Sequence, residues 1–127
     1  MDISETKRYY SKIKREDLCS CDCCQYYIDE IRSSYPAVSD YLTTLGVDIE
    51  KPFECGWPSD PVDGYMDYYV VLYLIVGNND GFKETKIGDV TIELIDSYPA
   101  ATYKGEYFII AAGPFHIKCR TDKYKFE

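Results

Sequence analysis

The chain of 127 residues has little of several features on which common protein chemistries depend. It has one histidine, and its most apolar run, Tyr68–Gly77, is far shorter than the roughly 20 residues that a membrane helix needs. The N-terminal segment is charged and lacks the apolar stretch of a signal peptide. We therefore expect no membrane association and a cytoplasmic protein whose thiols stay reduced.

The single histidine also narrows the catalytic options. A Ser-His-Asp or Cys-His site would have to use His116, which lies in a predicted strand without a nucleophile nearby in the sequence. A glycine-rich phosphate loop is absent from the sequence, and the acids of residues 60–67 do not have the spacing of an EF-hand calcium loop. We identify no catalytic residues, although the sequence leaves open whether the protein is an enzyme.

Basic side chains are scarce in the middle of the chain. Residues 19–64 carry nine acidic groups against two basic ones, a net charge of −7. Such a field repels phosphate backbones, so we expect no nucleic-acid partner. It would attract a basic protein partner or divalent cations, and the plainer alternative is a solvated face that keeps a small protein soluble.

A short N-terminal helix is predicted within residues 1–18, and two further helices are predicted in the first half of the chain. Asp22 and Gln25 have the spacing of a capping box, and a helix is expected over 23–33. Its apolar face is formed by Cys24, Tyr27, Ile28 and Ile31. Pro36 can open a second, antiparallel helix over 36–45, and Gly46 can end it in a left-handed conformation.

The second half of the chain alternates between β-rich runs and turn signals. The predicted strands cover 65–76, 89–95, 106–112 and 115–119. Residues 47–64, with three of the six prolines, are interpreted as an ordered connector. Helices followed by strands predict one α+β domain over 1–127, with the N-terminal helices packed on one face of a mostly antiparallel sheet of three to five strands.

The core should form between the long strand and the two helices. We expect Val70, Leu72 and Leu74, or the residues that alternate with them, to share a core with helix residues. The helix residues expected in this core are Ile28, Ile31 and Leu42.

Four of the six cysteines fall within the stretch DLCSCDCCQ at 17–25. Cys19, Cys21 and Cys24 combine C-x-C and C-x-x-C spacings, which allow thiolates to share one zinc ion. Adjacent residues at a helix start diverge by about 100°, so Cys23 should point away from the other three. A fourth ligand would have to come from Cys23, Cys55, Cys119 or His116.

Other roles for these cysteines remain open. Cys21 and Cys24 could form a redox motif, but a thioredoxin-like motif follows a strand, and Asp22 would raise the pKa of a neighbouring thiol. Structural disulfides would need an oxidising compartment. In the simplest alternative Cys24 packs in the core and the others are loop thiols.

The order C-x-C-x-x-C-Q-Y, then YPAVSDYLTTLGVDIEKPFE, then a tyrosine-rich strand resembles a family of small uncharacterised bacterial proteins. The matching positions are Cys19, Cys21, Cys24, Gln25, Pro36, Leu42, Gly46, Asp48 and Pro52. The resemblance implies a bacterial cytoplasmic protein, and it implies an aromatic residue at the position of Cys23.

Two functions from different classes follow from these observations. The first is a non-catalytic interaction domain, similar to toxin-neutralising immunity proteins, that binds a basic partner. Its contacts would come from aromatic residues, which are favoured at binding hot spots. The candidates are Tyr26, Tyr35, Trp57 and Tyr65. The alternative is a zinc- or thiol-dependent protein that uses Cys19, Cys21 and Cys24.

Overall fold

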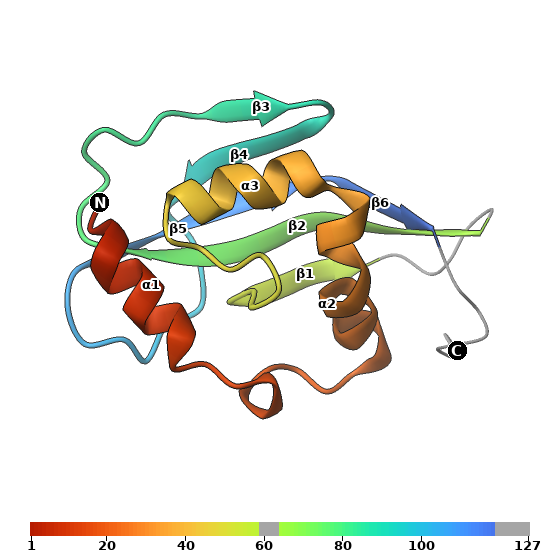
Figure 1. The fold of residues 1–127 in the computed structure, drawn as a ribbon, viewed down its shortest axis with the longest axis horizontal. Helices are drawn as coiled ribbons and strands as arrows, with labels where there is room; N and C mark the ends of the chain where they lie inside the picture. The colour runs from red at the N-terminus through yellow and green to blue at the C-terminus, as the bar shows by residue number, and fades with distance from the viewer. Residues whose placement is uncertain (59–63, 119–127) are drawn as a thin grey trace.

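The computed structural model describes residues 1–58 and 64–118. Helices come first and strands follow (Figure 1). The helices are α1 (Ile3–Ser11), the short 3-10 helix η1 (Arg15–Asp17), α2 (Asp22–Ser34) and α3 (Pro36–Thr44). The strands are β1 (Glu54–Pro58), β2 (Tyr65–Val76), β3 (Thr85–Ile87), β4 (Val90–Ile95), β5 (Tyr107–Gly113) and β6 (Phe115–Lys118).

The strands form one antiparallel sheet in the order β1-β2-β5-β4-β3. The sixth strand, β6, pairs with the first part of β2, and β5 pairs with the second part. The long strand β2 is therefore central, whereas β1 lies at an edge. The predicted α+β class is confirmed, with more strands than the expected three to five.

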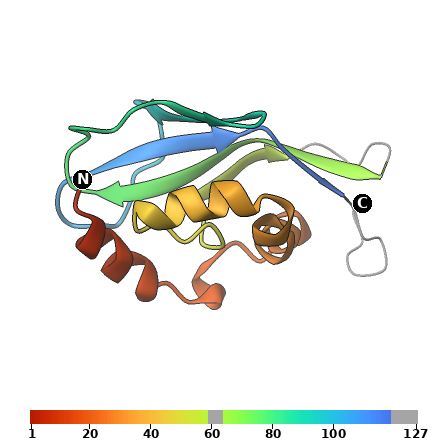
Figure 2. The same ribbon diagram turned by 45° about the horizontal axis from the view of Figure 1, so that its top comes forward.

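The three helices cover one face of the sheet (Figure 2). We call the buried cluster on this face the helix-side core; it is built around Ile31, Leu42, Val71, Tyr73 and Ile75. A smaller outer cluster on the opposite face contains Leu72, Leu74, Val76, Ile109 and Ala111. Ile31 is fully buried, as predicted, and the alternate residues of β2 are the ones that join Ile31 and Leu42.

The connection between α2 and α3 is shorter than a helical hairpin allows. One residue, Tyr35, separates the two helices, with φ −134° and ψ 64°. Antiparallel helix pairs need a loop of about 2–5 residues. Figures 1 and 2 both show α3 leaving α2 at a steep angle, so the predicted antiparallel arrangement of these helices is wrong.

The end of α3 follows the sequence prediction. Gly46 has φ +83°, and the Val47 backbone N–H donates to the Leu42 carbonyl at 3.0 Å. A Cβ atom at position 46 would lie 2.6 Å from the Ile3 carbonyl oxygen. Glycine is therefore required both for the left-handed turn and for the close approach of α1.

Two strands had no clear sequence signal. β1 falls in the segment interpreted as a connector, where the glycine and prolines around Trp57 argue against a strand. Proline is tolerated on an edge strand because one side of the strand makes no ladder hydrogen bonds. β3 has three residues, which is too short for a recognisable alternating pattern.

Candidate functional site

Three thiols meet at the start of α2, where residues 12–21, called here the connector between α1 and α2, enter this helix. Cys19 and Cys21 belong to this connector, and Cys24 lies in the first turn of the helix. Their Sγ atoms all lie within 4.8 Å of one another, and Cys24 is buried while the other two residues are exposed. This set, called here the thiol group, confirms the predicted grouping: its members are close enough to hold one metal ion.

The start of α2 determines this geometry. The helix begins at Asp22, and its cap is Cys21, whose Sγ accepts a hydrogen bond from the Cys24 backbone N–H at 3.4 Å. The predicted capping box of Asp22 and Gln25 is therefore wrong: the cap lies one residue earlier, and the Gln25 side chain bonds Arg15 and the Cys19 carbonyl. A sulfur in the cap position lies at the positive end of the helix dipole, which favours a thiolate, but burial outweighs this effect and raises the pKa of Cys21.

Gln25 holds the connector over this helix start. Its side-chain N–H group donates to the Cys19 carbonyl at 2.7 Å, and its side-chain oxygen accepts from Arg15 Nε and Nη2 at 2.8 and 2.6 Å. Arg15 also forms an ion pair with Asp29 of α2 at 2.8 Å. Because these contacts tie two points of the connector to α2, they fix Cys19 relative to Cys24.

The three thiols differ in their affinity for protons. A hydrogen bond from the Cys21 backbone, with further bonds to the neighbouring thiols, lowers the pKa of Cys19. Burial raises the pKa of Cys21 to about 11, and a hydrogen bond with Cys55 together with burial raises the pKa of Cys24 far above its ordinary value. Cys21 and Cys24 therefore keep their protons at neutral pH unless a cation compensates the charge.

The cysteines outside the thiol group have different positions. Cys55 of β1 lines a cavity of about 90 Å³ together with Cys19 and Cys24. Cys23 does not join the group, as predicted, but it packs half-buried against the helix-side core instead of facing solvent. Cys119 lies outside the described residues.

The four aromatic residues predicted to contact a partner do not form one surface. Tyr26 is fully buried in the helix-side core, so its predicted place on a binding surface is wrong. The side chain of Trp57 lies outside the described part of the chain. Tyr35 and Tyr65 are half-buried and both contact His116.

His116 is the centre of a polar group that the sequence did not reveal. The Tyr35 hydroxyl accepts the His116 backbone N–H at 2.8 Å, and the Tyr65 ring stacks on the imidazole with centroids 4.1 Å apart. His116 Nδ1 contacts a carboxylate oxygen of Asp67, its direct partner across β2 and β6. The pairing of these distant strands, which no local pattern specifies, brings the residues together.

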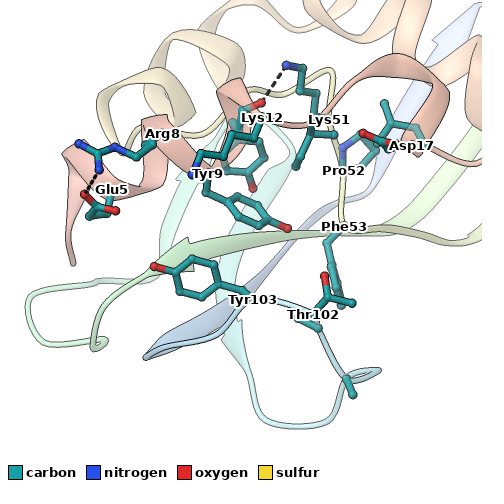
Figure 3. A pocket seen from close by; sticks show the side chains of 15 residues that line it. Glu5, Arg8, Tyr9, Lys12, Asp17, Lys51, Pro52, Phe53, Thr102 and Tyr103 are labelled. Atoms are coloured by element: carbon teal, nitrogen blue, oxygen red, sulfur yellow. Dashed lines mark hydrogen bonds and ion pairs between the residues drawn. The ribbon is translucent and has the colours of Figure 1, made fainter.

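A larger hollow of about 470 Å³ lies between α1 and residues 100–103 (Figure 3). Tyr9 and Tyr103 meet edge to face on its wall, with ring centroids 5.6 Å apart, and Arg8 pairs with Glu5 at 3.4 Å on its rim. Residues that line both this hollow and the smaller cavity are Asp17, Leu18, Pro52 and Phe53. Its walls combine apolar contact with several charged side chains and have no cluster of metal-ligating groups, so the thiol group remains the chemically distinctive site among the described residues.

Ion pairs offset part of the acidity of residues 19–64. Arg32 donates to Asp48 at 3.0 Å and to Glu50 at 2.7 Å, and Asp29 pairs with Arg15. Among the described residues of this segment, the exposed acids are Asp22, Asp40 and Glu54. The negative charge at the surface is therefore dispersed.

A scan against protein-family models and searches of curated proteins and solved structures found no match to this chain. Within residues 1–58 and 64–118, no helix is both long and apolar enough to span a membrane. The function must therefore be inferred from the geometry of the thiol group and its surroundings.

Proposed function

We propose that the thiol group binds a zinc ion and that the protein is a small zinc-stabilised domain. The observation that carries this proposal is the convergence of three Sγ atoms within 4.8 Å at the start of α2. With Zn–S bonds of about 2.3 Å, tetrahedral coordination separates the sulfurs by about 3.8 Å. The thiols therefore need to approach one another by about 1 Å or less to share an ion.

The donor set favours zinc over the common hard cations. Thiolates are soft ligands that suit zinc, whereas Mg²⁺ and Ca²⁺ take oxygen ligands. The Cys24 N–H that donates to the Cys21 sulfur, and the helix dipole behind it, offset part of the negative charge that the thiolates bring. A reducing cytoplasm, where we place the protein, would keep these thiols available.

The ion would act as a structural link. Two of the ligands belong to the connector and one to α2, so a shared metal would fasten the connector to the helix. Gln25 already holds this connector in place through Cys19 and Arg15. Residues outside the metal sphere that orient its ligands are a common feature of metal sites.

Thiol–disulfide exchange is the competing use of the same residues. The best attacking thiol has a pKa near the ambient pH. Burial raises the pKa of Cys21 to about 11, and the pKa of Cys24 is raised further, so the C-x-x-C pair makes a poor nucleophile at neutral pH. This supports metal binding over redox catalysis.

Competition between the reduced protein and a chromogenic zinc chelator tests the proposal. We expect one zinc per chain, and we expect Cys21→Ser to weaken affinity at least about a hundredfold, since outer residues alone contribute 10–100-fold at such sites. Cys23→Ser is the matched control and should bind as wild type does. The proposal fails if wild-type protein leaves the zinc with the chelator, or if Cys21→Ser competes equally well.

We also propose a second function, contact with a basic protein partner through the surface around His116. Tyr35 and Tyr65, two of the residues expected at a binding surface, contact His116 at one place beside Asp67. Aromatic side chains next to a carboxylate suit a basic partner, as in immunity proteins that neutralise toxins. The likeness to immunity proteins is an analogy of size and charge.

The neighbouring genes provide the discriminating observation for this second function. A gene for a nuclease or another basic toxin directly upstream would supply the probe, and co-expression with that toxin should protect the host cell. Tyr65→Ala should weaken the protection, and binding of the purified pair should weaken as salt rises, because exposed charges are screened over about 8 Å at 0.15 M salt. Salt-independent binding or full protection by Tyr65→Ala would contradict it.

A further inference from the structure

Cys55 lies on β1, the strand at one edge of the sheet. It is the direct cross-strand partner of Val71, which belongs to the helix-side core. Directly opposed residues on neighbouring antiparallel strands share a face of the sheet. The Cys55 side chain therefore points to the side covered by the helices, and it packs against the helix-side core.

On that side of the sheet, the Cys55 thiol meets the thiol group. Cys19, Cys24 and Cys55 line the same cavity of about 90 Å³. The Cys55 sulfur does not lie within 4.8 Å of all three sulfurs of the thiol group, so it would have to move closer to share their ion. A water molecule needs roughly 10–15 Å³ of such space, so the cavity beside Cys19, Cys24 and Cys55 is large enough to admit an ion.

We propose that Cys55 supplies the fourth thiolate, so that Cys19, Cys21, Cys24 and Cys55 form a closed tetrahedral zinc site. This inference rests on the zinc binding proposed above and adds the ligand that completes it. Four thiolates are a common ligand set of structural zinc sites. Binding forms four Zn–S bonds and releases the remaining thiol protons to solvent, without any change in oxidation state.

Other donors near the cavity are less well placed. Glu54 precedes Cys55 in β1 and is the partner of Leu72, which belongs to the outer cluster. Successive strand residues point to opposite faces, so the Glu54 side chain leaves β1 on the face away from the helices, although its charge still raises the pKa of Cys19. The Asp17 carboxylate, which also borders the cavity, accepts the Lys14 backbone N–H at 2.9 Å.

The fourth ligand changes what the metal does for the fold. With three ligands the ion fastens the connector to α2, whereas with Cys55 it also fastens the helical layer to β1. Among the described strands, β1 pairs with β2 alone, so one of its sides has no strand neighbour. A metal link at Cys55 would secure this edge strand, which is the kind of element that proteins need to protect.

X-ray absorption at the zinc edge of the wild-type protein counts the ligands without any substitution. We expect four sulfur neighbours at about 2.3 Å. Three sulfurs with one oxygen or nitrogen would overturn the inference while leaving the proposed zinc binding intact. A wild-type protein that takes up no zinc would overturn both.

Substitution then identifies the fourth sulfur. In the cobalt-loaded full-length protein, Cys55→Ser should lower the thiolate-to-cobalt charge-transfer absorption by about a quarter, and it should weaken zinc binding at least about a hundredfold. Cys23→Ser is the matched control and should leave both unchanged. If Cys55→Ser keeps the wild-type spectrum and affinity while Cys23→Ser loses them, the assignment of Cys55 is wrong although zinc binding stands.

Discussion

The polar atoms of the tyrosine-rich core and those of the thiol group have different partners. In the core, the Tyr73 hydroxyl donates to the Ile49 carbonyl at 2.7 Å and meets the Tyr27 hydroxyl at 2.6 Å. At the thiol group, Cys55 and burial are the main causes that raise the pKa of Cys24, whereas Cys21 lowers it. The core hydroxyls thus find partners within the chain, whereas the thiols face one another.

This difference indicates which region needs no bound ion to satisfy its polar groups. A buried hydroxyl with good hydrogen bonds needs nothing further, since its desolvation is offset by its partners. Thiols with a raised pKa, such as those of Cys21 and Cys24, can give up their protons when a cation replaces them. Removal of zinc by a chelator should therefore destabilise β1 and the connector between α1 and α2 more than it destabilises the core. Each of the following changes tests that contrast.

The largest effect is expected from Cys24→Ser. Cys24 is the buried member of the thiol group and contacts both Cys21 and Cys55, so its loss removes a ligand at the centre of the site. We expect zinc affinity to fall at least about a thousandfold, equivalent to about 4 kcal/mol. Chelator competition measures this, with Cys23→Ser as the control, and equal affinity in the two variants would contradict the proposed ligand set.

The next largest effect is the pH dependence of zinc binding. Because the pKa of Cys21 is about 11 and that of Cys24 is raised further, both thiols carry protons between pH 6 and 8 and must release them to bind zinc. Affinity should therefore fall as pH falls, by about a hundredfold or more per pH unit. Chelator competition at several pH values checks the slope, and a flat profile would mean that these thiols are not ligands.

The core provides the contrasting test. Tyr73→Phe removes the hydroxyl that donates to the Ile49 carbonyl and accepts from Tyr27, and it leaves both partners buried. We expect a loss of about 1–3 kcal/mol in the free energy of unfolding. Denaturant titration should give the same loss with zinc bound and after chelation, whereas a loss that depends on zinc would show that the two regions are coupled.

The smallest effect is expected from Gln25→Ala. This change removes the hydrogen bond to the Cys19 carbonyl and the contacts to Arg15, but it keeps every sulfur. We expect zinc affinity to fall about tenfold, at the lower end of what residues outside the metal sphere contribute. Gln25→Glu, which can still accept from Arg15 but cannot donate to Cys19, should give an intermediate value by the same chelator competition.

Local patterns were sufficient to predict the helical half of the fold. The helical spacing of Tyr27, Ile28 and Ile31 predicted α2 and its buried face, and Pro36 and Gly46 marked both ends of α3. These signals act within a few residues, so the sequence displays them directly. The steep crossing of the helices was missed because it depends on the single-residue connection at Tyr35.

The thiol group was predicted for the same reason, and its surroundings were not. Cys19, Cys21 and Cys24 lie within one helix start, where spacing alone brings them together. The position of Cys55 depends on the register between β1 and β2, and the Asp67–His116 contact depends on the register between β2 and β6. Strand register over such sequence separations is set by packing of the whole sheet.

The burial of Tyr26 illustrates a further limit. Adjacent tyrosines at 26 and 27 look alike in the sequence, and the helical stripe through Tyr27 suggested that Tyr26 would be exposed. Both are fully buried, because α2 is covered on more than one side by the sheet, the connector and α3. A hydrophobic stripe therefore underestimates burial when a helix has several neighbours.

The most direct test of zinc binding is the metal content of the reduced protein, measured together with the reactivity of its cysteines. We predict one zinc per chain, with Cys19, Cys21, Cys24 and Cys55 protected from a thiol reagent before chelation. After chelation, these four cysteines should react. A folded protein without zinc, in which Cys19 and Cys21 react at once and added zinc does not protect them, would contradict the central claim.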